Sequence, residues 1–279
     1  MQKKTKETIK TTLVHLFLAA MVIIAVFPIL WMFDSSLKGQ SEIYSSPPTF
    51  AIERVTFENY IRVIFDSGIP RAFLNSVIIS VTATFLTVVL GCLAGYGFSR
   101  YRFKGKKAMY VGLLYGQMMP AVVLIIPIYL VFSKIGLMDT HFSLILPDVA
   151  ITVPLATLML KGFFDGVSIE LEEAARLDGA SKLGILCRIV IPIARPGLIS
   201  VAIYTFLATW EEFIFALNLT NSENVRTLPI AINMFKGEFI IDWGAIMASG
   251  AVISIPVILI FMLCNKVFVK GIAEGSVKG

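Results

Sequence analysis

The sequence predicts an all-α membrane protein with six transmembrane helices. Of its 279 residues, 57% are hydrophobic and only 15% are charged. A soluble protein of this length would need far more polar residues to cover its surface. The apolar residues gather in runs of about 20, the length that a helix needs to cross a bilayer. We therefore expect a single transmembrane domain over residues 1–279.

Six apolar runs are long enough to form spans. The first follows a lysine-rich amino terminus, but its length and the lack of a small-residue cleavage site argue against a secretory signal peptide. Gly91, Gly95 and Gly97 provide a small-residue face for close helix packing in the second, and prolines predict a kink in the third. The spans cover about residues 11–33, 75–98, 108–132, 142–160, 196–217 and 243–268.

Lysine and arginine residues concentrate in alternate connections. The amino terminus, residues 99–107, residues 168–192 and the carboxyl tail are basic, whereas the remaining short connections hold one or two such residues. Because cytoplasmic loops carry the excess of Lys and Arg, both termini are expected in the cytoplasm of a multi-pass protein of the cell membrane. The same rule accounts for the net charge of +5 without a nucleic-acid partner.

A stretch of mixed charge, residues 168–192, interrupts the apolar chain between spans 4 and 5. Ser168 and Ser181 are suited to cap two short helices. Gly179 suits the left-handed turn that ends the first helix. The stretch therefore predicts helix, sharp turn and helix, with Pro192 as the residue that stops the second helix.

The first of these two helices is amphipathic. Glu172 and Arg176 are four residues apart, in the order that favours a surface ion pair. Four other residues share one stripe, which we expect to face inward and which is mostly small. Small side chains let another body approach the backbone closely. The stripe consists of Leu171, Ala174, Ala175 and Asp178.

Residues 173–192 resemble the EAA loop of ABC importer permeases. The sequence Glu-Ala-Ala is followed after three residues by glycine and after nine more by Ile-Val-Ile-Pro, in which only Ile191 departs from the usual pattern, by an apolar exchange. The extended form E-A-A-R-x-D-G-A is similar to the carbohydrate-importer branch. The resemblance implies a cytoplasmic coupling helix that docks on an ATPase subunit. The residues implied are Glu173, Ala174, Ala175, Asp178, Gly179, Ile189 and Pro192.

The carboxyl-terminal part, residues 206–279, carries a second block of the same resemblance. Its segments FLATWEEFIFAL, TLPIAI, DWGAIMAS and GIAEGSVKG are similar to the end of permeases for maltose and oligosaccharides, although Glu211 replaces the usual Asn. The resemblance implies import of a carbohydrate, such as an oligosaccharide, by alternating access. It also implies a second homologous permease, two ATPase subunits and an extracytoplasmic solute-binding protein as partners.

The sequence contains no motif for enzymatic chemistry. It lacks a G-x-x-x-x-G-K-[ST] loop for nucleotides. Its two histidines, His15 and His141, form no cluster at metal-ligand spacing. We expect a transport subunit that is no enzyme and holds no cofactor or metal. ATP and Mg²⁺ would belong to the partner ATPase subunits.

Polar residues within the predicted spans are candidates for a substrate pathway, because a charge at membrane depth commonly faces a cavity. The paired glutamates of span 5 follow Trp210, whose ring could stack on a sugar. Alternatively, they lie at the headgroup level, with the tryptophan as an interface anchor. A position at a loop end explains Asp148 equally well. The candidates are Gln117, Asp148, Trp210, Glu211, Glu212 and Asn218.

The connection at residues 218–242 is expected outside the cell. In the resembling family, the corresponding loop can reach into the cleft of the solute-binding protein. The alternative is an ordered loop that packs on the outer surface. The contact candidates are Asn233, Lys236 and Glu238.

Other functions remain open at this point. An ATP-independent secondary transporter would need intramembrane acid or base relays, for which only Asp148 and the span-5 glutamates are available. We find no convincing internal repeat of the kind from which many such transporters are built. A permease for a sugar phosphate or an amino acid is the alternative within the importer class.

Overall fold

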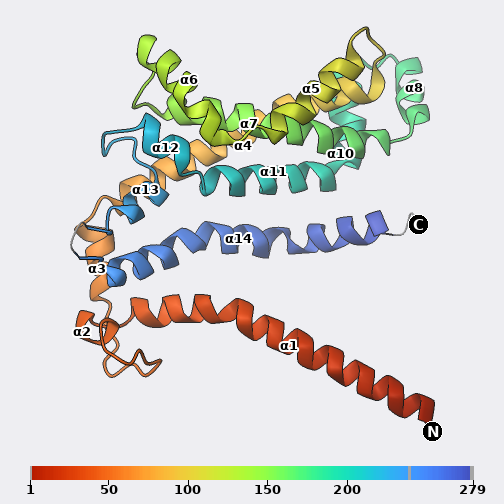
Figure 1. The fold of residues 1–279 in the computed structure, drawn as a ribbon. Coiled ribbons are helices and arrows are strands. Elements are labelled where there is room, and N and C mark those ends of the chain that lie inside the picture. Colours follow the sequence, from red (N-terminus) through yellow and green to blue (C-terminus); the bar gives the residue numbers. More distant parts are fainter. Residues whose placement is uncertain (1, 238–239, 277–279) are drawn as a thin grey trace. The chain divides into compact units, whose positions relative to one another are not determined.

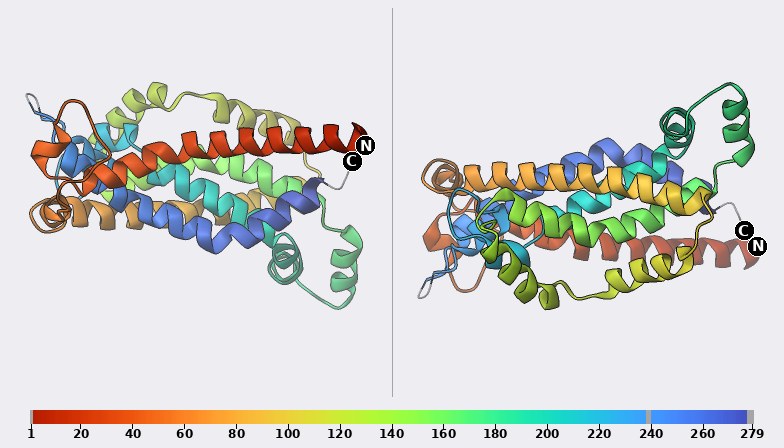
Figure 2. Two further views of the ribbon diagram at one scale, coloured as in Figure 1. Left: turned by 90° about the horizontal axis from the view of Figure 1, so that it is seen from below. Right: turned by 90° about the horizontal axis from the view of Figure 1, so that it is seen from above.

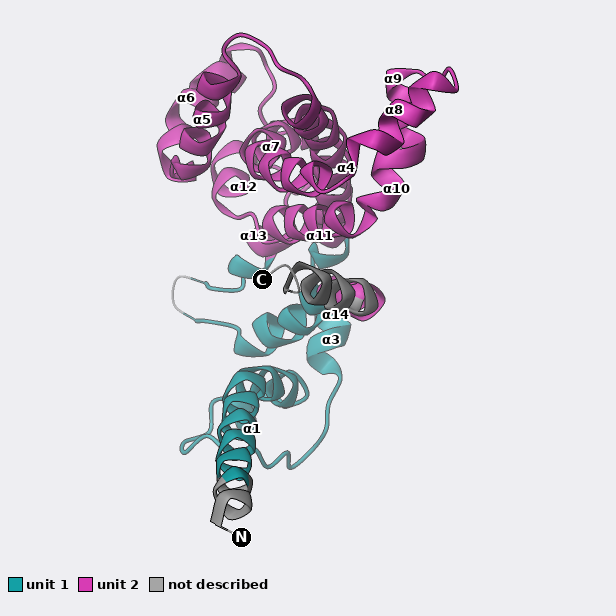
Figure 3. Cartoon of the chain, turned by 90° about the vertical axis from the view of Figure 1, so that its right-hand side faces the viewer, with its two compact units in different colours: residues 1–70, 232–254 teal, residues 71–231, 255–279 magenta. Residues whose placement is uncertain are grey.

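The computed structural model describes residues 2–237 and 240–276, and its regular elements are helices throughout this part of the chain (Figure 1). A lone antiparallel bridge between Lys236 and Ile241 is the exception. The prediction of an all-α protein is confirmed. Two compact units are present, one formed by residues 1–70 and 232–254 and the other by residues 71–231 and 255–279 (Figure 3).

Four to six of the described helical segments are suited to cross a membrane. Four are long and apolar enough alone: Lys10–Ser36, Ile69–Arg100, His141–Asp165 and Trp243–Cys264. Two bent pairs bring the number to six if each is one span: Lys106–Met118 with Ala121–Lys134, and Lys182–Ile193 with Arg195–Trp210. Five of the six predicted spans correspond to one of these segments in position, and span 5 does so only in part.

The first unit contains the amino-terminal helix and the polar connection that follows it. The buried Asn59 side chain donates hydrogen bonds to the backbone oxygens of Ser36 and Lys38, at 3.1 and 2.9 Å. Arg62 pairs with Asp242 at 3.0 Å. Polar side chains therefore order a segment that has little regular structure. The elements are α1 (Gln2–Ser36), α2 (Gln40–Ile43), α3 (Glu58–Phe65) and the first part of α14 (Trp243–Ser276).

The second unit holds most of the remaining helices around two apolar clusters. Leu160, Phe164 and Val190 are fully buried in one cluster, and Leu144, Phe215 and Leu219 are almost fully buried in the other. Its elements are α4 (Ile69–Arg100), α5 (Lys106–Met118), α6 (Ala121–Lys134), α7 (His141–Asp165), α8 (Ile169–Leu177), α9 (Lys182–Ile185), η1 (Leu186–Val190), α10 (Ile191–Ile193), α11 (Arg195–Trp210), α12 (Ile214–Leu219) and α13 (Leu228–Asn233), of which α4 begins and α13 ends in the first unit.

Helices α4 and α7 approach each other closely at two glycines. A Cβ atom added to Gly95 would lie 3.0 Å from the backbone nitrogen of Lys161, and one added to Gly91 would lie 3.0 Å from the Cβ of Ala156. Both distances are shorter than ordinary contacts. The predicted small-residue face is thus confirmed at these two positions. Gly97 has no neighbour within 4 Å of such an atom and takes no part in it.

Predicted span 3 is broken rather than kinked. Helices α5 and α6 meet at an angle of 98°. Between them, Met119 is extended, with φ −71° and ψ 124°, and Pro120 is extended as well. The ring of a proline disfavours the helical conformation of the preceding residue, and its nitrogen has no hydrogen to donate. The chain therefore leaves one helix and starts another.

We expect Gly95→Leu to destabilise the protein by about 1–3 kcal/mol, because overpacking in a well-packed core has this cost and the obstructing atom belongs to the backbone. Gly97→Leu is the matched control, since the space around Gly97 is open. Thermal unfolding of the two purified variants measures the difference. Equal melting temperatures would contradict the close approach of α4 and α7.

Candidate coupling and substrate sites

The stretch at residues 168–192 folds as helix, turn and helix, as its sequence predicts. The Oγ of Ser168 accepts a hydrogen bond from the amide of Glu170 at 3.2 Å, and that of Ser181 accepts one from Gly184 at 3.1 Å. Gly179 has a φ of +83°, which is the left-handed conformation that favours glycine. In both views of Figure 2, α8 and its turn project beyond helices α4, α7 and α11 of the same unit.

Pro192 does not stop the second helix, contrary to the prediction. Helical structure continues from α9 through a π-helical turn, η1, into α10, which ends at Ile193. The amide of Ile191 bonds to the carbonyl of Leu186, five residues back. A proline is tolerated in the first turn of a helical segment, where its missing N–H group is not needed. The chain bends by 83° only before Arg195.

The predicted surface pair between Glu172 and Arg176 is wrong. Glu172 is buried, with 1% of its side chain exposed. Its Oε1 accepts a hydrogen bond from the Nε of Arg100 at 2.6 Å, and its Oε2 accepts one from the hydroxyl of Tyr96 at 2.8 Å. It is the only fully buried side chain of α8. Helix α8 is therefore attached to α4 through the charged side chain of Glu172.

Arg100 extends this interaction to a third helix. Its Nη2 donates to the backbone oxygens of Phe164 and Val167, each at 2.8 Å. Its side chain is 8% exposed. Breaking a buried ion pair leaves an uncompensated charge, which is strongly destabilising. One guanidinium thus joins the end of α4, the end of α7 and the start of the exposed segment. In the sequence, Arg100 counted only as one of the basic residues of the 99–107 loop that indicate the orientation, and its ion pair with Glu172 was not predicted.

The stripe that we expected to face inward is mostly exposed. Leu171 of this stripe is 49% exposed, and Leu177, which lies outside the stripe, is 91% exposed. Ala174 and Asp178 are exposed too, and only Ala175 packs, half-buried, against an apolar cluster of the unit. Among the other residues of the EAA resemblance, Ile189 is half-buried, and Glu173, Gly179 and Pro192 are exposed. The segment therefore exposes small and apolar side chains together with charged ones, such as Glu173 and Asp178.

Predicted span 5 ends early, at the candidate glutamates. Helix α11 stops at Trp210, and α12 begins at Ile214. The Oε1 of Glu212 accepts a hydrogen bond from the amide of Phe215 at 2.6 Å, and its Oε2 accepts one from that of Ala216 at 3.0 Å. Glu212 therefore caps α12. Glu211 is exposed, and Trp210 is buried.

The structure places the remaining substrate candidates at different positions in the second unit. Asp148 of α7 is 5% exposed and interacts electrostatically with Glu212, so that two carboxylates lie near each other at the break in span 5. Gln117 lies apart on α5, where its Oε1 is buried and has no hydrogen-bond partner among the described residues. Asn218 is exposed and donates to Ile214 of its own helix at 2.7 Å.

The first part of the connection at residues 218–242 is attached to the start of α4. The Nδ2 of Asn75 donates to the backbone oxygens of Asn224 and Arg226, at 3.0 and 2.9 Å. The Nε2 of His141 lies 3.0 Å from the Oδ1 of Asn75. Sequence reasoning missed this contact, because the bonded groups on the loop are backbone oxygens, which leave no trace in the sequence.

A carboxylate, that of Asp139, also fixes the same loop. The Oδ1 of Asp139 accepts hydrogen bonds from the amides of Ser222 and Asn221, at 2.9 and 2.8 Å. These backbone hydrogen bonds, that of Ser222 first, lower the pKa of Asp139. Of the binding-protein candidates, Asn233 is half-buried and Lys236 is exposed. Glu238 lies outside the described residues.

The sequence matches one protein family over two thirds of its length. Residues 87–274 match the family described as "Binding-protein-dependent transport system inner membrane component". The matched range includes the whole exposed segment and the break in span 5. The match begins within α4 and ends within α14.

Two relatives and a solved structure extend the match to nearly the whole chain. A probable ABC transporter permease protein of Bacillus subtilis is 36% identical over 99% of this chain and 91% of its own. A trehalose/maltose transport system permease protein of Thermococcus litoralis is 34% identical over 98% and 99%. A crystal structure of a bacterial ABC transporter for alginate import shares the fold, with a TM-score of 0.82, 20% identity and coverage of 94% and 97%.

We expect Arg100→Met to release α8, because it leaves the buried carboxylate of Glu172 without its charge partner, at a cost of about 3–5 kcal/mol. Hydrogen exchange at the amides of residues 169–177 should accelerate accordingly. The double variant Arg100→Met/Glu172→Leu removes both charges and should exchange more slowly than the single variant.

Glu223→Gln is the control for this experiment. It removes an ion pair with Arg226 in which the glutamate is 80% exposed, and such pairs contribute about 0–1 kcal/mol. If Arg100→Met exchanges no faster than Glu223→Gln, the ion pair does not hold α8.

Proposed function

Because the chain belongs to the family of binding-protein-dependent transport system inner membrane components, we propose that it is the permease subunit of an ABC importer for a carbohydrate. It is a membrane transport component and no enzyme. The trehalose/maltose relative, which aligns over almost its whole length, and the similarity of residues 206–279 to sugar permeases support a di- or oligosaccharide. A sugar phosphate or an amino acid is the alternative substrate class.

The observation that carries this proposal is the exposed helix α8 on a buried ionic anchor. A helix that served only its own fold would bury its apolar side chains, yet α8 exposes Leu171 and Leu177 and buries Glu172. Exposed apolar residues are typical of a site that binds another protein. The neighbouring alanines are small and let such a protein approach the backbone closely. We infer that this surface docks on an ATPase subunit through Glu173, Ala174, Ala175, Asp178, Gly179, Ile189 and Pro192.

The orientation that we propose places this segment in the cytoplasm together with both termini. The distribution of Lys and Arg supports it. Residues 218–242 are then external, where Asn233 and Lys236 are candidates for contact with a solute-binding protein. The proposed assembly contains a second homologous permease, two ATPase subunits that carry ATP and Mg²⁺, and the solute-binding protein after which the family is named.

The mechanism that we propose is alternating access. Closure of the ATPase subunits would displace α8. Since Arg100 bonds to α8 and to the end of α7 from the end of α4, the three elements would move as one body. The carboxylates at the break in span 5 would line the route of the sugar, because carboxylate oxygens accept hydrogen bonds from hydroxyl groups.

We expect the reconstituted importer to take up a labelled disaccharide or oligosaccharide only with its binding protein and ATP. Gly179→Val should abolish uptake and reduce recovery of the ATPase subunit, because a β-branched residue resists the left-handed conformation. Gly162→Val, at an open helical position of α7, is the control. Uptake driven by an ion gradient without ATP would refute the importer, and selective uptake of an amino acid or a sugar phosphate would refute the carbohydrate.

The two glutamates should respond differently to substitution. Glu212→Ala should lower the melting temperature, because loss of a helix cap costs about 0.5–2 kcal/mol. Glu211→Ala should leave stability unchanged and reduce sugar uptake roughly tenfold or more, as expected for a lost charged hydrogen bond of about 1.5–3 kcal/mol. Glu211→Gln should retain part of the uptake. Wild-type uptake in both Glu211 variants, at equal protein levels, would remove this residue from the pathway.

A further inference from the structure

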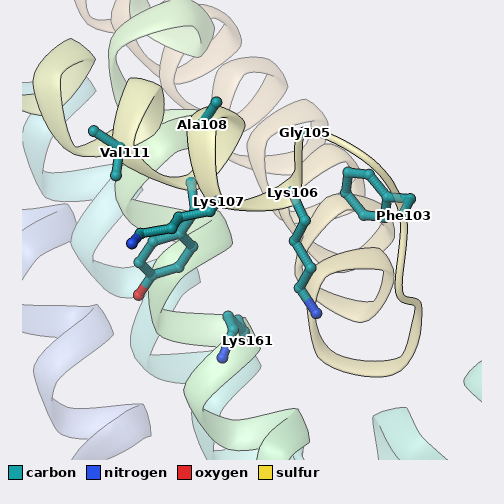
Figure 4. Close-up of a pocket in the computed structure, with 8 residues that line it drawn as sticks. Phe103, Gly105, Lys106, Lys107, Ala108, Val111 and Lys161 are labelled. Atoms are coloured by element: carbon teal, nitrogen blue, oxygen red, sulfur yellow. The ribbon is translucent and has the colours of Figure 1, made fainter.

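A pocket rich in lysine lies between the start of α5 and α7, within the second unit. It has a volume of about 1070 Å³. Figure 4 shows Lys106 and Lys107 extending from the start of α5 and Lys161 from α7. The rest of the lining is apolar or aromatic: Phe103, Gly105, Ala108, Tyr110 and Val111. No acidic residue lines the pocket in the part of the chain that the structure describes.

The charges of the three lysines are only partly compensated. Lys161 pairs with Asp165 at 2.5 Å and lies 5.8 Å from the centre of the Tyr110 ring. Lys106 donates one hydrogen bond, to the backbone oxygen of Tyr101 at 3.0 Å. Lys107 is exposed and makes no ion pair or hydrogen bond within the described residues. At least two ammonium groups therefore keep hydrogens for an external anion.

The position of the pocket coincides with an expected membrane boundary. Lys106 and Lys107 directly precede predicted span 3, and Lys161 directly follows predicted span 4. Immediately beyond the lysines, the surface of α5 becomes apolar, with Met109 58% exposed and Leu114 43% exposed. A basic rim above an exposed apolar helix matches the two ends of a phospholipid, a negatively charged headgroup and its acyl chains.

We propose that this pocket binds the phosphate headgroup of an anionic phospholipid from the cytoplasmic leaflet. Basic pockets between spanning helices on the cytoplasmic side are typical sites for such headgroups. The lysines bind the phosphate as point charges, and the acyl chains lie along α5. The inference rests on the proposed orientation, in which residues 99–107 are cytoplasmic. The lipid would thereby join α5 to α7 close to the end of α4.

The experiment uses the purified complex of permease and ATPase subunits, with native mass spectrometry to count bound lipid. Phosphatidylglycerol is the anionic probe and phosphatidylcholine the neutral reference. Lys106→Gln/Lys107→Gln should weaken phosphatidylglycerol binding roughly 25-fold, since each lysine near a membrane surface contributes about fivefold. Lys106→Arg/Lys107→Arg keeps both charges and should keep the lipid, which separates lost binding from misfolding.

Arg102→Gln/Lys104→Gln is the matched control. It removes two positive charges from the same loop, and neither residue lines the pocket. Equal lipid loss in both Gln pairs would overturn the pocket as the site. Full displacement of phosphatidylglycerol by inorganic phosphate in excess would overturn the lipid as the ligand, in favour of a free anion.

This outcome is independent of transport. A complex that binds phosphatidylglycerol through these lysines but imports no sugar contradicts only the proposed function. A complex that imports sugar and binds lipid without dependence on the lysines contradicts only this inference. An impermeant thiol reagent that labels a cysteine at position 104 from outside the cell would overturn the orientation on which the inference rests.

Discussion

The ion pair between Arg100 and Glu172 decides where the exposed segment of the second unit lies. Helix α8 has a single fully buried side chain, and that side chain is charged. A carboxylate in such a place is stable only with a charge partner and with hydrogen bonds to both oxygens. Arg100 and Tyr96, both from α4, meet these two requirements. The position of α8 relative to α4 therefore depends on two directional bonds, with little apolar contact to support them.

This kind of attachment suits a segment that transmits movement. Apolar surfaces in contact can slide past each other, because the hydrophobic effect has no direction. A guanidinium that holds a carboxylate and two backbone oxygens has a defined orientation toward each. Helix α4 also carries hydrogen bonds near its other end, where Asn75 holds the backbone of residues 224 and 226. Both ends of α4 are thus fixed to segments for which we propose contact with a partner protein.

Local features of this site were predictable from the sequence, and its tertiary contacts were not. The caps at Ser168 and Ser181 and the turn at Gly179 depend on residues within a few positions of one another. The burial of Glu172 depends on a residue 72 positions earlier in the chain. Helix periodicity assumes that the apolar stripe faces the core, and this assumption fails where a helix exposes that stripe. The same limit applies to the break at Pro120, since prolines within α7 leave that helix continuous.

The break in span 5 indicates a polar environment around the neighbouring residues Glu211 and Glu212. Residues 211–213 are not helical, although the sequence on both sides is apolar. Non-helical backbone at membrane depth is tolerated only where it is buried in protein or lines a water-filled cavity, because lipid offers no hydrogen bonds. Glu212 satisfies two of the amides at the start of α12, whereas Glu211 is exposed beside them. An exposed carboxylate at such a break is stable only in contact with water or a polar ligand, an environment that the headgroup level provides as well as the sugar pathway that we propose.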